Sequence, residues 1–195
     1  MSPILNIDTA VEAASVCLAN EATILGLKVN PSRKDHATWL HVAIAEVMEG
    51  CNCSMEELEA VAVSAGPGSY TGLRVGMAAA KGLCYALQKP LISISTLKMM
   101  AVAALTESTD LICPMIDARR MEVFTAVYDK QLNEIIPSQN YILNGDSFEA
   151  LLEKHTITFF GNGSSKFQNI TSHPNASFKN IEATAQHMVP LSQQQ

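Results

Sequence analysis

The sequence predicts an α/β protein of two lobes, on three observations. Three short apolar segments within 4–29 have the pattern of an antiparallel strand meander ahead of the first helix. Residues 60–87 then form an apolar run, a glycine-rich break and a helix-like segment, which together make a strand–loop–helix unit. A polar stretch at 106–110 separates these elements from a further group of strands. We therefore expect an N-terminal lobe over residues 1–105 and a C-terminal lobe over residues 106–195.

The order of the meander is informative. Its strands are expected at Ile4–Asp8, Val16–Leu18 and Thr23–Val29, with a short turn between the second and the third. Three strands in succession before a helix indicate the ribonuclease-H-like lobe that actin-like ATPases share. Asp8 closes the first strand. An acid at this place either helps to hold a metal ion or water or caps the following loop, and the sequence leaves both roles open.

Composition restricts the class of protein. With 195 residues, 48% of them hydrophobic and 16% charged, the chain has ample material for a folded core. Lys and Arg number 13 against 19 Asp and Glu, which gives a net charge of −6, and no basic run exceeds two residues. A main nucleic-acid-binding surface is therefore not expected. We find no signal-peptide pattern and no apolar run of membrane-spanning length, so we expect a cytoplasmic protein without membrane contact.

The cysteines point to the same compartment. They number five, which is odd, and Cys17, Cys84 and Cys113 lie within apolar segments. This usage is typical of reduced, buried thiols in a cytoplasmic protein. Cys51 and Cys53 are separated by one residue, which is closer than the usual spacing of a zinc knuckle, so we expect no zinc there.

The first helix is expected over about 35–48, and a short helix follows at the capping box Ser54–Glu57. His36 and His41 lie five positions apart, about 140° around the helix axis. They therefore cannot chelate one metal ion as a pair four positions apart can. The expected core stripe of the first helix is Leu40, Ile44 and Val47.

Four glycines punctuate the stretch that follows the apolar run at 60–63. They are Gly66, Gly68, Gly72 and Gly76, and they allow the backbone to turn sharply and pack closely. The loop is not a Walker A motif, because no Lys-Ser or Lys-Thr follows its last glycine. Its spacing fits either a purely structural turn or an anion site at the start of a helix. Both interpretations remain open from the sequence.

The helix expected over 75–87 carries a single charge, Lys81, in thirteen residues. A helix that is apolar on all sides is buried on more than one side. It is therefore either a central core helix or a helix shared between the sheet and a partner protein. The sheet-facing stripe is Gly76, Ala79, Ala80, Leu83 and Leu87, and Arg74 extends the opposite face. The candidate partner-binding residues are Ala78, Lys81, Gly82 and Tyr85, with Val42 and Ala45 of the first helix beside them.

The remaining elements are weaker in pattern. Residues 117–120 link two expected strands. On an extended chain, Asp117 and Arg119 share one face, and Arg120 and Glu122 share the other. We therefore expect internal ion pairs here. The polar, abrupt end of the chain makes the second lobe look short of its last elements. Strands are expected at 90–94, 111–116, 121–128 and 156–160, helices from a Ser95 or Thr96 cap to 105 and near 146–154, and a turn at 161–163.

Taken together, these residues resemble the TsaB (YeaZ) family, a bacterial component of the machinery that makes threonylcarbamoyladenosine in transfer RNA. The resemblance covers nearly the whole chain in the expected order, and its glycine-loop and DARR blocks are the most specific parts. The matching segments are ILNIDTA at Ile4–Ala10, Ser15-Val16, Arg33–His36, SAGPGSYTGLRVGMAAAKGL at Ser64–Leu83, Ser95–Leu97 and DARRMEVFTAVY at Asp117–Tyr128.

This resemblance implies an actin-like, two-lobed fold with only a degenerate nucleotide site. It also implies a non-catalytic scaffold that binds the catalytic paralogue TsaD, with the ATPase TsaE joining and transfer RNA reached only through the complex. In TsaD a His-x-x-x-His pair binds metal, and the corresponding positions here are Thr96 and Met100. A hydroxyl and a thioether are poor ligands for a hard or borderline metal. We therefore expect no metal centre, no cofactor and no catalytic residue.

Two departures from the family pattern are visible. His41-Val42 replaces a common Leu-Pro in the first helix, and the C-terminus stops early. We expect a homodimer when the chain is alone. The competing functions are a metal-dependent peptidase, a sugar-kinase-like ATPase that would use Asp8 with Gly66–Gly72, and an independent signalling homodimer.

Overall fold

The computed structural model describes residues 3–30, 32 and 35–194 and divides the chain into two compact units. The first unit comprises Met1–Met99 and Ala183–Gln195, and the second comprises Met100–Glu182. Arg33 and Lys34, which belong to one of the motifs above, lie outside the described residues.

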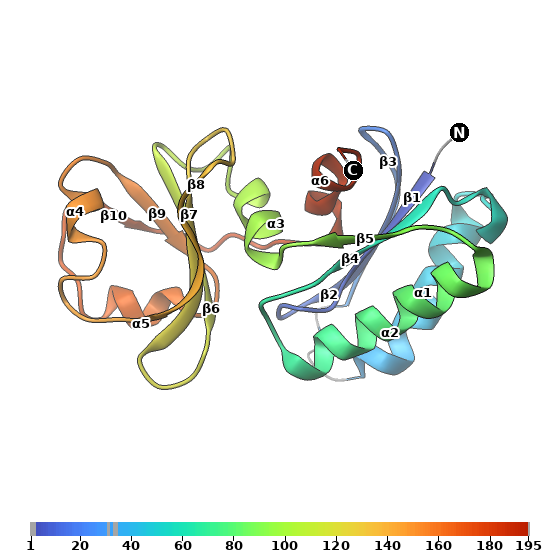
Figure 1. Ribbon diagram of the computed structural model, residues 1–195, viewed down its shortest axis with the longest axis horizontal. Coiled ribbons are helices and arrows are strands. Elements are labelled where there is room, and N and C mark those ends of the chain that lie inside the picture. The colour runs from blue at the N-terminus through green and yellow to red at the C-terminus, as the bar shows by residue number, and fades with distance from the viewer. Residues whose placement is uncertain (1–2, 31, 33–34, 195) are drawn as a thin grey trace. The chain divides into compact units, whose positions relative to one another are not determined.

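A five-stranded sheet forms the centre of the first unit (Figure 1). The central strand β1 pairs antiparallel with β2 and parallel with β4, so that Leu5 lies opposite Leu18 on one side and Val61 on the other. The three-strand meander expected from the sequence is confirmed. In spatial order the strands are β3 (Thr23–Asn30), β2 (Ala14–Asn20), β1 (Pro3–Asp8), β4 (Ala60–Ser64) and β5 (Leu91–Ile94).

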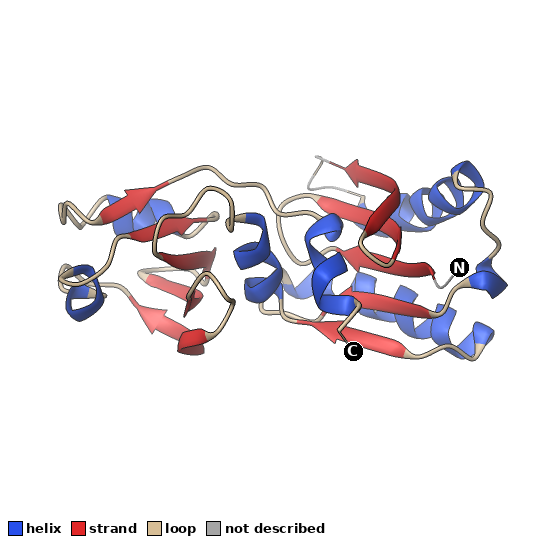
Figure 2. Ribbon diagram, turned by 90° about the horizontal axis from the view of Figure 1, so that it is seen from above, coloured by secondary structure: helices blue, strands red, loops and turns tan. Residues whose placement is uncertain are grey.

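Helices cover both faces of this sheet. On one face α1 (His36–Gly50) and α2 (Tyr70–Leu87) bury a common apolar cluster, which includes the core stripe expected for the first helix. The 3₁₀ turn η1 (Met55–Glu57) precedes β4, and its Glu57 carboxylate accepts a hydrogen bond from the N–H of Ser54. On the other face lie η2 (Ala185–Met188) and α6 (Val189–Ser192), seen over the strands in Figure 2. The Ala185 N–H donates to Ser15 Oγ at 2.8 Å.

A second five-stranded sheet forms the second unit. Its core is aromatic: the Phe148 ring stacks on Tyr141 at 4.8 Å between centroids, and Phe159 meets Phe167 edge-on at 4.9 Å. In spatial order the strands are β10 (Ala176–Phe178), β9 (Ile157–Phe160), β6 (Leu111–Asp117), β7 (Glu122–Tyr128) and β8 (Glu134–Ile142). The short helices α4 (Glu149–Leu152) and α5 (Ser164–Gln168) belong to this unit, and α3 (Thr96–Ala103) leads into it from the first.

The two units differ in two places from the lobes expected at 1–105 and 106–195. It falls within α3, after Met99, and the segment from Ala183 onward belongs to the first unit. The reason for the second difference is that η2 and α6 contact β1, β2 and β5 and cover their otherwise open face. Four elements were not expected from the sequence: β8, β10, α5 and the η2–α6 segment.

The ion pairs expected around Asp117 are wrong. Arg119 and Arg120 both have positive φ angles, 70° and 45°, so the link is a tight turn and not an extended chain. Asp117 pairs instead with Lys166 of α5 at 2.8 Å, and this contact lowers the pKa of the Asp117 carboxyl. Glu122 accepts a hydrogen bond from Asn140.

Candidate partner-binding surface

The helix α2 divides into a buried face and an exposed face. Gly76, Ala79 and Ala80 are buried against the sheet. The outward residues Ala78, Lys81, Gly82 and Tyr85 are all exposed, and Tyr85 retains 82% of its surface. Ser69 begins the helix by accepting a hydrogen bond from the Gly72 N–H, and Gln88 ends it with a left-handed backbone. One side of this eighteen-residue helix is therefore exposed at the surface of its unit.

Two hollows flank this outward side, and Ala78 contributes to both of them. The first, of about 460 Å³, lies toward the start of the helix and is lined by Tyr70, Leu73, Arg74, Met77 and Lys81 among others. The second, of about 450 Å³, lies between α2 and α1, which run side by side on one face of the sheet (Figure 1). Its lining residues are Ala37, His41, Val75, Ala78, Ala79, Gly82 and Leu83.

The residues named for α1 lie near this groove in a way that the sequence did not anticipate. Val42 is 54% exposed and Ala45 is exposed, but neither lines the groove; Ala37 and His41 line it instead. Ala45 follows His41 by four positions and so continues the same stripe along the helix surface. On a helical wheel, Ala37 and His41 lie on the same stripe of α1 as Ala45. Extending that stripe toward the start of the helix would have found them.

The glycine loop joins β4 to α2 and packs directly on the turn after β1. Gly66 has a φ of 106°, a backbone conformation that L side chains rarely adopt. At Gly72 a Cβ atom would overlap the carbonyl oxygen of Thr9, and the Thr9 hydroxyl donates to the Gly72 carbonyl at 2.7 Å. Gly68 and Gly76 make similarly close approaches to Ala10 and Thr9.

This packing also bears on the anion site. The Ser69 N–H donates to the Ala10 carbonyl oxygen at 2.8 Å, and the Gly72 N–H donates to Ser69 Oγ. Two N–H groups at the start of α2 are therefore already satisfied within the protein, with main-chain carbonyls packed against the helix start. The geometry favours a structural turn here.

Asp8 is fully buried at the end of β1. Burial raises the pKa of its carboxyl from the usual 3.8 to about 6, while the Ala10 N–H lowers it in part. The Ala10 N–H donates to Asp8 Oδ1 at 3.0 Å, which is the loop-capping contact considered above. Among the described residues, Asp8 Oδ2 and Ser64 Oγ have no hydrogen-bond partner.

We predict that Asp8→Asn stabilises the protein at neutral pH. Because the pKa of Asp8 is raised in the folded state, ionisation of this carboxyl opposes folding. The free-energy cost of the ionisation is absent below about pH 4, increases up to about pH 6 and is constant at higher pH. At 1.36 kcal/mol per pKa unit this amounts to about 3 kcal/mol at pH 7.5. Urea unfolding of both proteins from pH 4 to 8 measures it, with the exposed Asp146→Asn as control. A difference between Asp8→Asn and wild type that does not change with pH would contradict the assignment.

No cluster of three or more His, Cys, Asp or Glu side chains suited to a metal ion occurs in the part of the chain that the structure describes. Thr96 and Met100 are buried in α3, where Ser95 Oγ accepts from the Lys98 N–H as its cap. All five cysteines are free thiols. None of the described helices is both long and apolar enough to cross a membrane.

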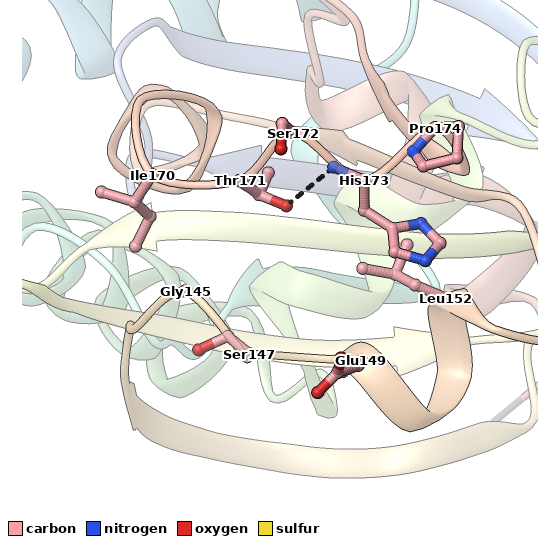
Figure 3. A pocket seen from close by; sticks show the side chains of 9 residues that line it. All are labelled: Gly145, Ser147, Glu149, Leu152, Ile170, Thr171, Ser172, His173 and Pro174. Atoms are coloured by element: carbon pink, nitrogen blue, oxygen red, sulfur yellow. Dashed lines mark hydrogen bonds between the residues drawn. The ribbon is translucent and has the colours of Figure 1, made fainter.

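A further hollow, of about 350 Å³, lies in the second unit and is shown in Figure 3. Ser147 and Glu149 line one side of it, and the segment from Ile170 to Pro174 lines another. Some of its polar groups bond within the protein: the His173 N–H donates to Thr171 Oγ1, and His173 Nδ1 accepts from the Asn175 N–H. Ser147 Oγ bonds to Asn144.

Comparison with known proteins decides the family. The chain is 31% identical over 188 residues to the tRNA threonylcarbamoyladenosine biosynthesis protein TsaB of Bacillus subtilis (strain 168), covering 94% of this chain and 81% of that protein. The chain belongs to the TsaB family. A second TsaB, from Escherichia coli (strain K12), is 32% identical over 155 residues, which cover 79% of this chain and 64% of that protein.

Three further matches agree with this membership. The family described as TsaD: tRNA N6-adenosine threonylcarbamoyltransferase matches residues 23–191. A solved structure titled YeaZ from Pseudomonas aeruginosa has a TM-score of 0.79 at 24% identity, over 98% of this chain and 91% of that one. A second structure from that organism, titled as similar to peptidase YEAZ, has a TM-score of 0.85 at 24% identity, over 98% and 90%. The two mixed sheets with their helices are thus the actin-like α/β fold of the TsaB family, as the sequence predicts.

Proposed function

We propose that this chain is a non-catalytic subunit of the complex that forms threonylcarbamoyladenosine next to the anticodon of transfer RNAs, and that it binds a TsaD-type transferase. One observation carries the proposal: the outward side of α2 is exposed over its length and flanked by two hollows. A long exposed helix side with hollows beside it is suited to the docking of a partner protein. The relatives named TsaB support the pathway, and the match of this chain to the TsaD family supports a relationship in fold between the two proposed subunits.

The absence of a catalytic role rests on separate features. Within the described residues there is no cluster of three or more His, Cys, Asp or Glu side chains suited to the metal ion that the peptidase alternative requires. The start of α2 and the turn at Thr9–Ala10 are packed against each other, so the loop is poorly suited to grip phosphate. We therefore assign catalysis to the transferase and place this cytoplasmic subunit beside it. A TsaE-type ATPase joins the assembly, transfer RNA is reached only through the complex, and the free chain forms a homodimer.

We predict that the purified chain alone does not hydrolyse ATP appreciably. The reason is that it lacks a Walker lysine and that Asp8 is buried and bonded to the Ala10 N–H. Phosphate release measured with and without magnesium checks this. Robust turnover that is lost in Asp8→Ala would favour the sugar-kinase-like alternative and contradict a non-catalytic subunit.

The proposal itself is tested by mixing the chain with the TsaD-type transferase of the same cell and separating the mixture by size-exclusion chromatography. We expect a single peak that contains both proteins and elutes ahead of either alone. Separate elution at micromolar concentration, with both proteins folded by circular dichroism, would contradict it.

A further inference from the structure

The charges on the outward side of α2 are all of one sign. The helix contains no Asp or Glu, and its two cations, Arg74 and Lys81, are both exposed. They are seven positions apart, which places them on the same side and about 10 Å apart along the axis. The chain as a whole has a net charge of −6, so this cationic pair stands out against an acidic background.

Neither cation is neutralised within the described residues. The ion pairs of this part of the chain join Lys28 to Glu46, His155 to Asp110 and Lys166 to Asp117. Arg74 lies over the ring of Tyr70, with 5.4 Å from the guanidinium carbon to the ring centroid, and this contact leaves its hydrogen-bond donors free for an anion.

Arg74 and Lys81 line the same hollow as the apolar side chains of Leu73 and Met77. An apolar hollow with two unpaired cations fits a partner segment in which an apolar side chain enters the hollow and a carboxylate lies on each side of that side chain. A nucleic acid backbone would meet the cations but would leave Leu73 and Met77 uncovered.

From these observations we propose that the outward side of α2 recognises a partner helix carrying two carboxylates two turns apart, which pair with Arg74 and Lys81 while apolar side chains fill the hollow. This inference rests on the proposed function, because it describes how the transferase is recognised. The same charges oppose pairing with a second copy, since a symmetric dimer brings identical surfaces together and so gathers four cations on one interface. The charge pattern therefore favours the acidic partner over self-association.

The test is the salt dependence of both associations, measured by analytical ultracentrifugation in about 0.05 M and about 0.5 M NaCl. For the complex with the TsaD-type transferase, we expect the dissociation constant to rise about tenfold with salt. For the homodimer we expect it to stay constant or fall. Arg74→Gln/Lys81→Gln is expected to weaken the complex about tenfold in low salt and to remove most of the salt dependence. Lys154→Gln, an exposed charge of the second unit, is the control and should change neither.

The possible failures are distinguishable. If the complex forms but responds neither to salt nor to the double variant, the acidic-helix proposal is overturned while the proposed function stands. If no complex forms at either salt concentration, the proposed function itself fails, and this inference with it. If the double variant keeps its affinity for the transferase but loses binding of transfer RNA, the face recognises RNA, and the proposal is likewise overturned.

Discussion

Gly72→Ala is expected to lower the free energy of unfolding by about 3 kcal/mol and the melting temperature by about 10 °C. The new methyl group would overlap the carbonyl oxygen of Thr9, and backbone cannot move aside as a flexible side chain can. Relief of the overlap would separate α2 from the end of β1 and disturb the hydrogen bond from the Thr9 hydroxyl to the Gly72 carbonyl. Thermal and urea unfolding of the purified variant measure the effect.

Gly82→Ala provides a matched control on the same helix. A Cβ at Gly82 meets nothing within 4 Å, so the same substitution should gain the ordinary helix preference of alanine, about 0.5–1 kcal/mol. Opposite signs at the two positions would show that the loss at Gly72 comes from close packing and not from glycine replacement in general. A Gly72→Ala variant as stable as wild type would show that the close contact with Thr9 is not rigid.

Ala78→Arg is expected to weaken binding of the TsaD-type transferase at least about 100-fold while leaving the monomer folded. Ala78 lines both hollows, so a long cationic side chain there blocks a helix from approaching either one. The residue is exposed, so the cost to the isolated chain is small.

The measurement is titration calorimetry of each variant with the transferase, supported by its melting temperature. Gly82→Arg should behave in the same way, because Gly82 lines the groove between α1 and α2. The control is Ala150→Arg, an exposed alanine of the second unit, which should bind like wild type. Native affinity in Ala78→Arg together with native stability would mean that the transferase uses another face.

Elements with strong apolar periodicity could be predicted from the sequence. The meander β1–β3, the helices α1 and α2 and the strands β6 and β7 fall within a few residues of their expected positions. By contrast, β8 is an edge strand that contains Pro137 followed by an exposed polar run at 138–140, so its pattern is that of a loop. The η2–α6 segment was missed because both of its elements are only four residues long and their partner strands are far away in sequence.

The candidate surface could be predicted from the sequence only in part. The outward stripe of α2 follows from helical periodicity alone, and all its named members are exposed. The close packing at Gly72 does not follow from the sequence, because its neighbour Thr9 is 63 residues away and only the folded chain brings the two together. The partnership of Asp117 with Lys166, 49 residues apart, is a second case of the same limit.

The central claim, that this chain supports catalysis through α2 without contributing catalytic groups, is tested most directly by reconstitution. The TsaD-type and TsaE-type proteins, transfer RNA, ATP and the threonylcarbamoyl donor are combined, and threonylcarbamoyladenosine is quantified by mass spectrometry. We predict modification with the wild-type chain and with Asp8→Asn, and little or none with Ala78→Arg or without the chain. Full modification in the absence of the chain, or its loss in Asp8→Asn when the complex still forms, would contradict the account.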